Sequence, residues 1–430
     1  MSGAAGARGV REFLCGTAPA DVAAALARCL PAGSEVAVPA PLRVKLKPGR
    51  SLTVWYDVAV PGAGTPPRSV VVTWPAAGVA LPGSAPELEE EARARGVLAP
   101  FVRARAVTPD GAACVRVSPV DTAFPQLVRL HDPAYLAGAL RTAGVRVDHV
   151  PSVRSVRFRP GQRHVLRVQA GGPALFAKIY RDHTGPYAVA VAQWAADAFA
   201  AAGLDDVSSG RGAYVATDRM ALWPEVAGRP LSALLTGGGP AAAEAVSRAG
   251  AALRALHEAP PPAGLRPRPD VTTAAAETLR AAQVIDVLLP AVGALLRDVV
   301  RRAVATLLAL PGEPPAFVHG DYKCDNILAG DAGLHLLDFD RSGYGDPAAD
   351  VGKFLADLRW CVGGDPARTA ALHAAFLAGY GPADGNRLAR AGAHDMLLAP
   401  RLAGRRASVH DPAWEQRVTS AVGAAAGAGT

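Results

Sequence analysis

Two short apolar runs in the last third of the chain are each followed by a carboxylate, and their spacing constrains the fold more than any other feature. The run 317–318 comes shortly before Asp321, and the run 334–337 comes directly before Asp338. Asn326 lies five residues after Asp321 and twelve residues before Asp338. Apolar runs of this length between polar residues are typical of short buried strands. We therefore expect two strands that bring the turns after them side by side.

An Asp, an Asn and a second Asp in this order suit phosphoryl transfer. The carboxylate of Asp321 would accept the proton of a hydroxyl group. The amide oxygen of Asn326 and the carboxylate of Asp338 would hold Mg²⁺ against nucleotide phosphates. Asp and Asn are also common in turns, so each residue alone would indicate no more than a strand, a turn and a strand. The three residues in this order and spacing favour the catalytic interpretation.

These loops resemble those of the aminoglycoside phosphotransferase and choline kinase family, small-molecule relatives of the protein kinases, in its capped, actinobacterial-type form. Residues 318–328 match the catalytic loop, with His-Gly-Asp where protein kinases have His-Arg-Asp, and residues 337–340 match the metal-binding loop. The Gly-Asp-Pro-x-x-Asp segment at 345–350 also resembles the family. The resemblance covers roughly residues 150–360 well. It implies an α+β, protein-kinase-like two-lobed fold with an N-terminal cap domain.

The resemblance implies a role for each residue of these loops. Asp321 would be the catalytic base, and Asn326 and Asp338 would bind Mg²⁺. The supporting residues that it implies are His319 as a loop scaffold, Asp340 as a metal assistant or salt-bridge partner, and Asp350 as a brace of the catalytic loop. The implied cofactors are ATP and Mg²⁺, and the implied substrate is a small molecule with a hydroxyl group.

Residues 174–180, Ala-Leu-Phe-Ala-Lys-Ile-Tyr, are typical of a strand and contain Lys178. In kinase-like folds a lysine at this position pairs with the α- and β-phosphates of the nucleotide, and the alternative interpretation is an exposed strand lysine. In the family, a Glu in the following helix usually orients this lysine. The helix expected over 186–203 contains no Glu, so Gln193 or Asp197 is the expected partner.

Two further segments are expected to contact the nucleotide. Residues 220–231 resemble the hinge between the lobes, whose backbone groups bind adenine in this family. A basic-Pro-Gly turn at 159–161 lies between two expected strands that precede Lys178. The nucleotide-binding residues expected in these segments are Gly161, Trp223, Glu225 and Val226.

The chain contains an internal repeat. Residues 43–58 and 156–169 both show a strand, a basic-Pro-Gly turn and a second strand, and a third strand follows each. Pro-Gly is a common turn, so chance is an alternative. Duplication predicts a small antiparallel sheet over 43–74 that superposes on the second copy, with Val72 near the position of Lys178. The expected domains are a cap at 1–110, as a degenerate copy of the N-lobe, a connecting segment at 111–150, the kinase-like N-lobe at 151–222, and a helical C-lobe with both loops at 223–430.

The composition of the 430 residues limits the class of protein. Half of them are hydrophobic and 19% are charged, which is typical of a globular chain of two or three domains. The net charge is +7, but arginines alternate along 153–159 as on an exposed strand face, so we expect no nucleic-acid partner. No apolar run is long enough for a signal peptide or a membrane span, so we expect no membrane partner and a cytoplasmic location. The five cysteines form no Cys-x-x-Cys pair, so neither a zinc site nor a disulfide framework is expected.

Two other functions fit the same residues. The first is a capped sugar or amino-sugar kinase, a type whose metal-binding loop often has Gln where this chain has Asn326. The second, from another class of protein, is a catalytically silent nucleotide-binding or regulatory kinase homologue.

The charges of the C-terminal segment are informative about the acceptor. Residues 381–430 contain four acids and six arginines. A cleft for a polycation such as an aminoglycoside needs carboxylates, because opposite charge raises the local substrate concentration. Arginines on helix surfaces are commonly only solvated, which is the alternative. We therefore hypothesise a neutral or anionic hydroxyl compound with at most one positive charge.

Overall fold

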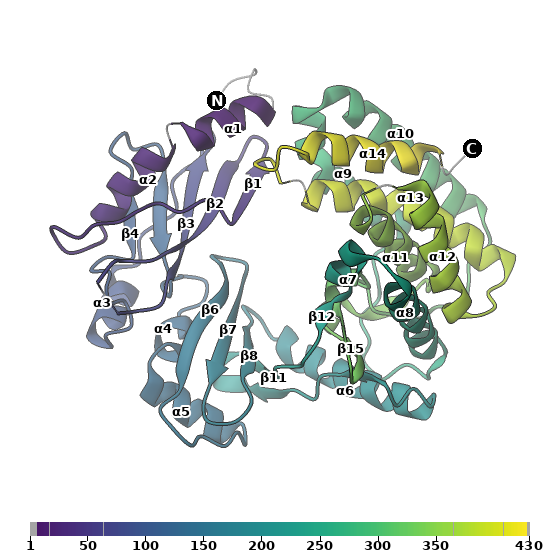
Figure 1. The fold of residues 1–430 in the computed structure, drawn as a ribbon, viewed down its shortest axis with the longest axis horizontal. Coiled ribbons are helices and arrows are strands. Elements are labelled where there is room, and N and C mark those ends of the chain that lie inside the picture. The colour runs from purple at the N-terminus through teal and green to yellow at the C-terminus, as the bar shows by residue number, and fades with distance from the viewer. Residues whose placement is uncertain (1–6, 17, 63, 364, 407, 428–430) are drawn as a thin grey trace. The chain divides into compact units, whose positions relative to one another are not determined.

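Helices and strands mix along the whole described part of the chain, which comprises residues 7–16, 18–62, 64–363, 365–406 and 408–427 of the computed structural model (Figure 1). Internal contacts divide the chain into two units. Unit 1 holds the described residues within 1–186, 212–225 and 408–411, and unit 2 holds those within 187–211, 226–407 and 412–430. The α+β class predicted from the sequence is confirmed. None of the described helices is long and apolar enough to cross a membrane.

The first sheet of unit 1 has five antiparallel strands in the order β1-β2-β3-β5-β4. The strands are β1 (Arg43–Lys47), β2 (Ser51–Val58), β3 (Arg68–Pro75), β4 (Arg105–Val107) and β5 (Cys114–Val117). The helices of this segment are α1 (Ala7–Cys15), α2 (Ala18–Ala27) and α3 (Pro86–Ala94). Every second side chain of β2 from Leu52 to Val58 is buried, as in a strand with one face on a core.

The second sheet of unit 1 also has five antiparallel strands, in the order β6-β7-β8-β11-β10. The strands are β6 (Ser152–Arg159), β7 (Arg163–Gln169), β8 (Leu175–Ile179), β10 (Ala213–Val215) and β11 (Met220–Pro224). The helices around it are α4 (Gln126–Leu130), α5 (Pro133–Thr142) and the short η1 (Ala216–Asp218). Arg154 and Arg157 of β6 are exposed, but Val156 is exposed too and Arg159 is half-buried, because the register shifts between Ser155 and Arg157, so the expected alternation is only partly seen.

The two sheets share a strand order and a hairpin register, which supports the duplication. Counted from the Pro-Gly turns, Thr53 of β2 is equivalent to Val165 of β7. Thr53 pairs with Thr73, and Val165 pairs with Lys178. Thr73 therefore holds the position of Lys178, and the prediction of Val72 is wrong by one residue. The shift matters because successive side chains of a strand point to opposite faces.

The two sheets of unit 1 also share a hydrophobic core. Val71 of the first sheet lies in one buried cluster with Phe158 and Leu166 of the second sheet. The indole Nε1 of Trp55 donates to the carbonyl oxygen of Phe158 at 2.9 Å. The segment 111–150, expected to be a connection, contributes β5, α4 and α5 to this unit, so the first sheet extends beyond residue 110.

Unit 2 is mainly helical. Its helices are α6 (Thr184–Ala201), which begins in unit 1, α7 (Leu231–Gly237), α8 (Pro240–Glu258), α9 (Val271–Leu288), α10 (Pro290–Ala309), α11 (Ala348–Cys361), α12 (Pro366–Tyr380), α13 (Gly385–Arg406) and α14 (Trp414–Gly427). One small sheet has the order β12-β14-β15-β9, with β9 (Val207–Ser209), β12 (Arg229–Pro230), β14 (Ile327–Gly330) and β15 (Gly333–Leu336). The other pairs β13 (Ala316–Val318) with β16 (Gly343–Gly345). The short helices η2 (Cys324–Asn326) and η3 (Phe339–Arg341) lie in the two loops predicted to be catalytic and metal-binding.

Glycines allow the helices of unit 2 to pack closely. A side chain at Gly352 of α11 would clash with the carbonyl oxygen of Ala391 in α13. A side chain at Gly250 of α8 would clash with the carbonyl oxygen of Phe376 in α12. These helix pairs lie side by side (Figure 1). Their close packing fixes α11, which carries residues of the candidate site.

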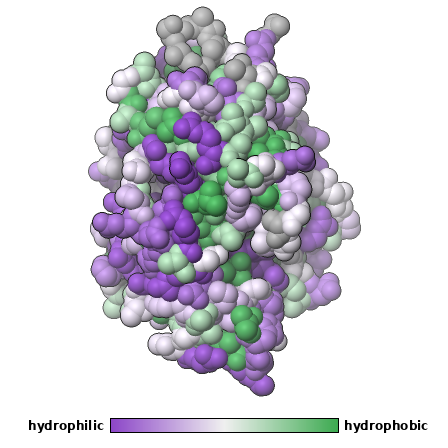
Figure 2. All heavy atoms as spheres, turned by 90° about the vertical axis from the view of Figure 1, so that its left-hand side faces the viewer, coloured by the Kyte–Doolittle hydropathy of each residue, from purple (hydrophilic) through white to green (hydrophobic). Residues whose placement is uncertain are grey.

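The surface view shows hydrophilic residues around separate hydrophobic areas (Figure 2). The large hydrophobic side chains that are exposed in the described part of the chain include Val150 and Leu308. Scattered exposed hydrophobic side chains of this kind are normal on a protein surface. These side chains therefore mark no functional site.

Candidate active site

The expected catalytic loop begins where β13 ends, and α11 holds its backbone in place. Asp350 of α11 accepts hydrogen bonds from the N–H groups of His319 (2.5 Å) and Gly320 (2.9 Å). Gly320 has a left-handed φ of 72°, and a side chain there would clash with the carbonyl oxygen of Arg341. The loop therefore requires its glycine. Burial alone would raise the pKa of Asp350, but His257, His319 and the Gly320 N–H lower it below its usual value.

The β14–β15 hairpin brings the two expected magnesium ligands together. The N–H of Leu337 donates to the carbonyl oxygen of Asn326 at 2.9 Å, which sets Asp338 directly beside the loop that carries Asn326. His319 Nε2 donates to the carbonyl oxygen of Leu337 at 3.1 Å, and burial lowers the pKa of this imidazole, so a neutral ring links the two loops. Asp338 has a left-handed φ of 67°, a strained conformation that is frequent at functional sites. Asp340 follows in η3.

Two lysines contact the expected catalytic base. Lys323 Nζ donates to Asp321 Oδ2 at 2.7 Å, and Lys353 Nζ donates to Asp321 Oδ1. Asn326 Nδ2 donates to the same carboxylate at 3.2 Å. Burial alone would raise the pKa of Asp321, but Lys353 and Lys323 hold it well below its usual value. Asp321 is therefore ionised and able to accept a proton at neutral pH.

The amide of Asn326 is oriented for a cation. Its Nδ2 donates to the backbone oxygen of Asp321 at 2.9 Å as well as to the carboxylate. Among the described residues, none donates a hydrogen bond to its Oδ1. Amide and carboxylate oxygens are the ligands that Mg²⁺ prefers in proteins. The Oδ1 of Asn326 and the carboxylate of Asp338 therefore fit a magnesium ion by their chemistry.

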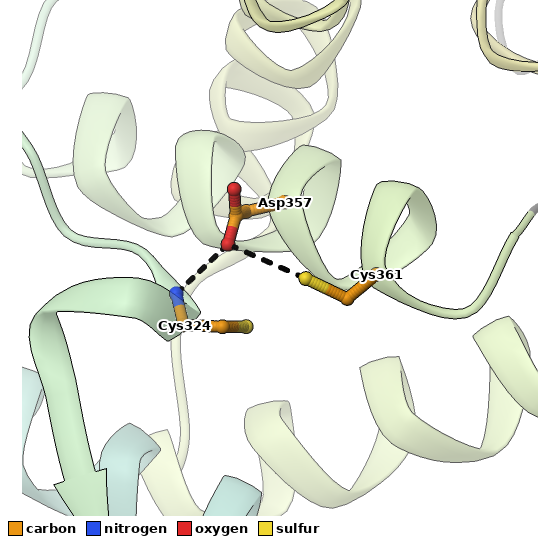
Figure 3. Close-up of side chains that lie close together, drawn as sticks. All are labelled: Cys324, Asp357 and Cys361. Atoms are coloured by element: carbon orange, nitrogen blue, oxygen red, sulfur yellow. Dashed lines mark hydrogen bonds between the residues drawn. The ribbon is translucent and has the colours of Figure 1, made fainter. Parts of the chain in front are cut away.

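A second cluster ties the same loop to α11 (Figure 3). Cys324 N donates to Asp357 Oδ2 at 2.8 Å, and Cys361 Sγ lies 3.9 Å from the same oxygen. The three side chains offer possible metal ligands within 4.8 Å of one another. However, Arg406 Nη2 forms an ion pair with Asp357 Oδ1 at 2.7 Å, and burial raises the pKa of the Cys324 thiol well above its usual value. The guanidinium supplies the positive charge here, so we interpret the cluster as a structural brace.

Helix α11 thus contacts the catalytic loop from one face. Asp350, Lys353 and Asp357 are three and four residues apart, a spacing that places side chains on the same side of a helix. Asp350 binds the backbone N–H of Gly320, and Lys353 binds the expected base, Asp321. Asp357 binds the N–H of Cys324. A single helix therefore positions three points of the loop.

A cleft of about 270 Å³ lies beside this loop, within unit 2. Its lining includes Gly320 and Lys353 from the site, Arg268 and Glu277 from around α9, and Arg401 from α13. The remaining lining residues are Pro269, Asp270, Val271, Ala274, Val318, Gly345, Asp346, Ala349, Asp350, Arg390, His394, Leu397 and Leu398. A small molecule bound there would lie next to the segment that carries Asp321.

The acidic residues of this cleft already have partners. Glu277 pairs with Arg401 at 2.6 Å. Asp346 binds Arg390 at 2.6 Å and His394 at 3.0 Å. Burial alone would raise the pKa of Asp346, but these two partners lower it to about 2. The cleft therefore offers no spare carboxylate from these residues to a cationic acceptor.

In unit 1, Lys178 lies in β8 between Val165 of β7 and Ala221 of β11. Its Nζ lies 5.5 Å from the centroid of the Tyr180 ring. The turn with Gly161 has a left-handed φ of 72°, which glycine adopts readily. The Gly161 N–H donates to Asp121 Oδ2 at 2.8 Å. In this structure the N–H therefore serves a carboxylate and has no free hydrogen for a phosphate.

The other expected nucleotide-binding residues lie around the end of β11. The division between the units falls between Glu225 and Val226. The N–H of Glu225 donates to the carbonyl oxygen of Ala174 at 2.8 Å, and its carboxylate binds Arg167 at 2.6 and 2.9 Å. The side chain of Glu225 is thus occupied, while Trp223 and Val226 are partly exposed.

Gln193 lies in α6 and has a local partner. Its Nε2 donates to Asp197 Oδ1 at 3.1 Å, and Arg211 lies 3.3 Å from the same oxygen. The two residues considered as partners of the strand lysine therefore bind each other in unit 2.

Sequence analysis missed Lys353, Lys323, Asp121 and Arg406. Lys323 could have been noticed from its place two residues after Asp321. Lys353 follows Asp350 by three residues on an expected helix, which is also a visible signal. Asp121 and Arg406 lie far along the chain from their partners, and no local pattern marks them.

Solved structures of small-molecule kinases are similar to this chain. A microcompartment-associated aminopropanol kinase is 17% identical, with a TM-score of 0.49 over 69% of this chain and 95% of that chain. Spectinomycin phosphotransferase, in complex with ADP and spectinomycin, is 13% identical, with a TM-score of 0.47 over 67% and 92%. Choline kinase from Cryptosporidium parvum Iowa II is 12% identical, with a TM-score of 0.46 over 69% and 95%.

No curated protein sequence matches the chain. The model of one family, described as the phosphotransferase enzyme family, matches residues 156–391, which is more than half of the chain. This match includes Lys178, the catalytic loop, the metal-binding loop and α11. The chain therefore belongs to the phosphotransferase enzyme family, as its two loops predicted.

Proposed function

We propose that this phosphotransferase transfers the γ-phosphoryl group of ATP to a hydroxyl group of a small molecule. The observation that carries the proposal is the shared hydrogen-bond network of Asp321 and Asn326 beside Asp338. A base and two oxygen ligands for a divalent cation, held together by one hairpin and one helix, are what phosphoryl transfer to an alcohol requires.

The proton of the acceptor would go to Asp321. As the hydroxyl oxygen forms its bond to phosphorus and the bond to the leaving nucleotide oxygen breaks, the carboxylate accepts the hydroxyl proton. Lys323 and Lys353 keep Asp321 ionised and fix its two oxygens. A carboxylate with so low a pKa is a weak base, so its main contribution is to orient the hydroxyl group and to take the proton late.

Asn326 Oδ1 and the carboxylate of Asp338 would hold Mg²⁺, with Asp340 close by in the sequence. When bound, the ion would neutralise charge on the nucleotide phosphates. Lys178 would bind the α- and β-phosphates, and the backbone around Val226 would bind the adenine. The hydrogen bond from Gly161 to Asp121 argues against a phosphate contact by the Gly161 N–H.

A catalytically silent nucleotide-binding protein is the second candidate function. Two observations favour it: the Gly161 N–H is occupied, and α6 has no Glu to orient Lys178. The intact arrangement of Asp321, Asn326 and Asp338 favours the enzyme, because a binding protein does not need an ionised base held by two lysines.

An acceptor screen with the full chain tests the proposal. ADP release is measured with Mg²⁺ and ATP across sugars, aminoglycosides, amino alcohols, nucleosides and hydroxy acids with their phosphate esters. Asp321→Asn should lower acceptor-dependent turnover by about 10²–10⁴-fold, as expected for loss of a general base, and should keep nucleotide affinity. Asp331→Asn is the matched control, since Asp331 is an exposed carboxylate in the turn of the same hairpin.

Two outcomes would contradict the proposal. Near-normal turnover of Asp321→Asn would exclude the base. Magnesium-dependent nucleotide binding without acceptor-dependent ADP release from any compound class would favour the silent homologue.

A further inference from the structure

Three arginines gather next to the catalytic base. Arg401 and Arg405 are four residues apart near the end of α13, so they lie on one face of that helix. Arg341 ends η3, directly after the metal-binding loop. Arg401 lines the same cleft as Lys353, which binds Asp321, and the charges of Arg341 and Asp321 act on both Arg401 and Arg405. We call Arg341, Arg401 and Arg405 the arginine cluster.

The arginine cluster has fewer negative partners than positive charges. Glu277 pairs with Arg401 at 2.6 Å. Within the described part of the chain, the guanidinium groups of Arg341 and Arg405 form neither a hydrogen bond nor an ion pair. The side chain of Arg405 is exposed, so it is open to a ligand, and partial loss of solvent and repulsion from Arg401 and Arg341 lower its pKa. An anion bound at this place would relieve the repulsion.

The cleft beside the loop is also lined by an arginine without a carboxylate partner. Arg268 lines it, and the hydrogen bond of its guanidinium goes to the backbone oxygen of Arg341 at 2.7 Å rather than to a carboxylate. Two further acids line the cleft: Asp270 caps α9 by accepting a hydrogen bond from the Thr273 N–H at 2.7 Å, and Asp350 accepts from the N–H groups of His319 and Gly320. The donors still available along this wall are therefore cationic.

The position of the cleft favours the acceptor over the nucleotide as the source of the anion. Arg401, Lys353 and Gly320 line it, whereas the expected magnesium ligands Asn326 and Asp338 do not. Its volume of about 270 Å³ suits a small compound. This volume is just below the roughly 300–1,000 Å³ of pockets for drug-sized ligands. An acceptor in the cleft would thus lie against the guanidinium groups of Arg401 and Arg268 and beside the segment that carries Asp321.

We propose that the acceptor is an alcohol with an anionic group, a phosphate or a carboxylate, which the arginine cluster binds while the hydroxyl group faces Asp321. This inference rests on the proposed function. Guanidinium groups bind phosphate and carboxylate in bidentate fashion, which gives both affinity and orientation. The same cluster repels polycationic acceptors, which narrows the hypothesis of a neutral or anionic substrate to the anionic class.

A matched series of acceptors tests the inference in the full-length enzyme. Glycerol 3-phosphate, glycerate, glycerol and 2-amino-1,3-propanediol differ mainly in charge, and kcat/KM is measured for each with Mg²⁺ and ATP. Binding of inorganic phosphate is measured by calorimetry without nucleotide. Arg405→Gln should weaken phosphate binding and raise the KM of anionic acceptors by about 10- to 100-fold, the effect of a lost charged hydrogen bond. Arg301→Gln, at an exposed arginine of α10, should leave both values unchanged.

The outcomes separate the inference from the function on which it rests. Higher kcat/KM for the neutral or cationic acceptor, or phosphate binding equal in wild type and Arg405→Gln, would overturn the anionic acceptor. An Arg405→Gln variant with a raised KM for ATP alone would assign the cluster to the nucleotide and would also overturn it. If ADP release depends on no acceptor while phosphate binding still depends on Arg405, the proposed function fails and the anion site remains.

Discussion

The two sheets of unit 1 have the same strand order but differ in the residues that could contact a nucleotide. The third strand of the second sheet contains Lys178, and the equivalent position of the first sheet holds Thr73. Both hairpin turns contain a left-handed glycine, Gly49 with φ 65° and Gly161 with φ 72°. The N–H of Gly161 binds Asp121, which comes from the segment between the sheets.

This comparison shows that the architecture and the chemistry of the sheet are separable. The strands that build the core have alternating buried residues in both copies, such as Val54 and the equivalent Leu166. Lys178 lies on the opposite face from that core alternation, so the position could lose its cation without loss of the fold. The first sheet therefore provides matched control positions for the second.

Of the substitutions in the two sheets, removal of the strand lysine should have the largest effect on the reaction rate. Lys178→Met should lower kcat/KM for ATP by about 10²–10³-fold, because it deletes the positive charge that we propose to bind the phosphates. Thr73→Val is the control in the first sheet, where the buried hydroxyl has no hydrogen-bond partner among the described residues. Steady-state kinetics with varied ATP check both variants. A wild-type rate for Lys178→Met would show that the two sheets do not differ in function.

Removal of Asp121, whose carboxylate binds the turn of the second sheet, should lower the stability and raise the nucleotide affinity. Asp121 accepts hydrogen bonds from Gly161 N at 2.8 Å and from His164 Nε2 at 2.7 Å. Asp121→Ala should lower the free energy of unfolding by about 1–3 kcal/mol, since buried donors lose their partner. It should also lower the KM for ATP, because the Gly161 N–H becomes available. Glu35→Ala, at an exposed carboxylate of the same unit, is the control for both measurements.

The His164–Asp121 pair should make the free energy of unfolding depend on pH. The first sheet has no such pair, because Leu52 holds the position equivalent to His164. Burial lowers the pKa of His164 below 6.5, so only the unfolded chain takes up a proton as the pH falls below that value. The stability is therefore full above about pH 6.5 and decreases on acidification, by about 1.4 kcal/mol per pH unit for each such proton. His164→Leu should reduce this slope by one proton in urea unfolding between about pH 7 and pH 5. An unchanged slope would exclude a contribution from His164.

Replacement of the two turn glycines by alanine should have the smallest effect on stability and kinetics. Gly49→Ala and Gly161→Ala each place a methyl group in open space but force a left-handed φ, so each should lower the free energy of unfolding by about 1–2 kcal/mol. Thermal unfolding checks this equality. Only the variant at Gly161 should change the KM for ATP. Equal changes of the KM at both turns would show that the turn of the second sheet has no closer relation to the nucleotide than that of the first.

The two loops could be predicted from the sequence because their geometry is local. An apolar strand before Asp338 and a hairpin back to Asn326 determine that these residues meet. Gly320 is also locally required, by its left-handed φ. The family and the α+β class follow from this short region.

The remaining contacts depend on how distant segments pack. Lys353 and Arg401 reach the loop from α11 and α13, and the register of these helices is set by their close approach at Gly352. The error at Val72 has a similar cause, because the length of the loop before β3 decides which residue pairs with Thr53. A pattern of residues along one strand does not contain that information.

Helix α11 has a consequence for the accuracy of catalysis. Asp350, Lys353 and Asp357 are parts of one rigid body, so an error in its placement would shift the loop backbone, the base and the adjacent turn together rather than one at a time. That placement depends on the bare backbone of Gly352 against α13. A side chain at Gly352, which lies outside the site, would therefore displace all three contacts together and change the reaction rate without a change in any reacting group.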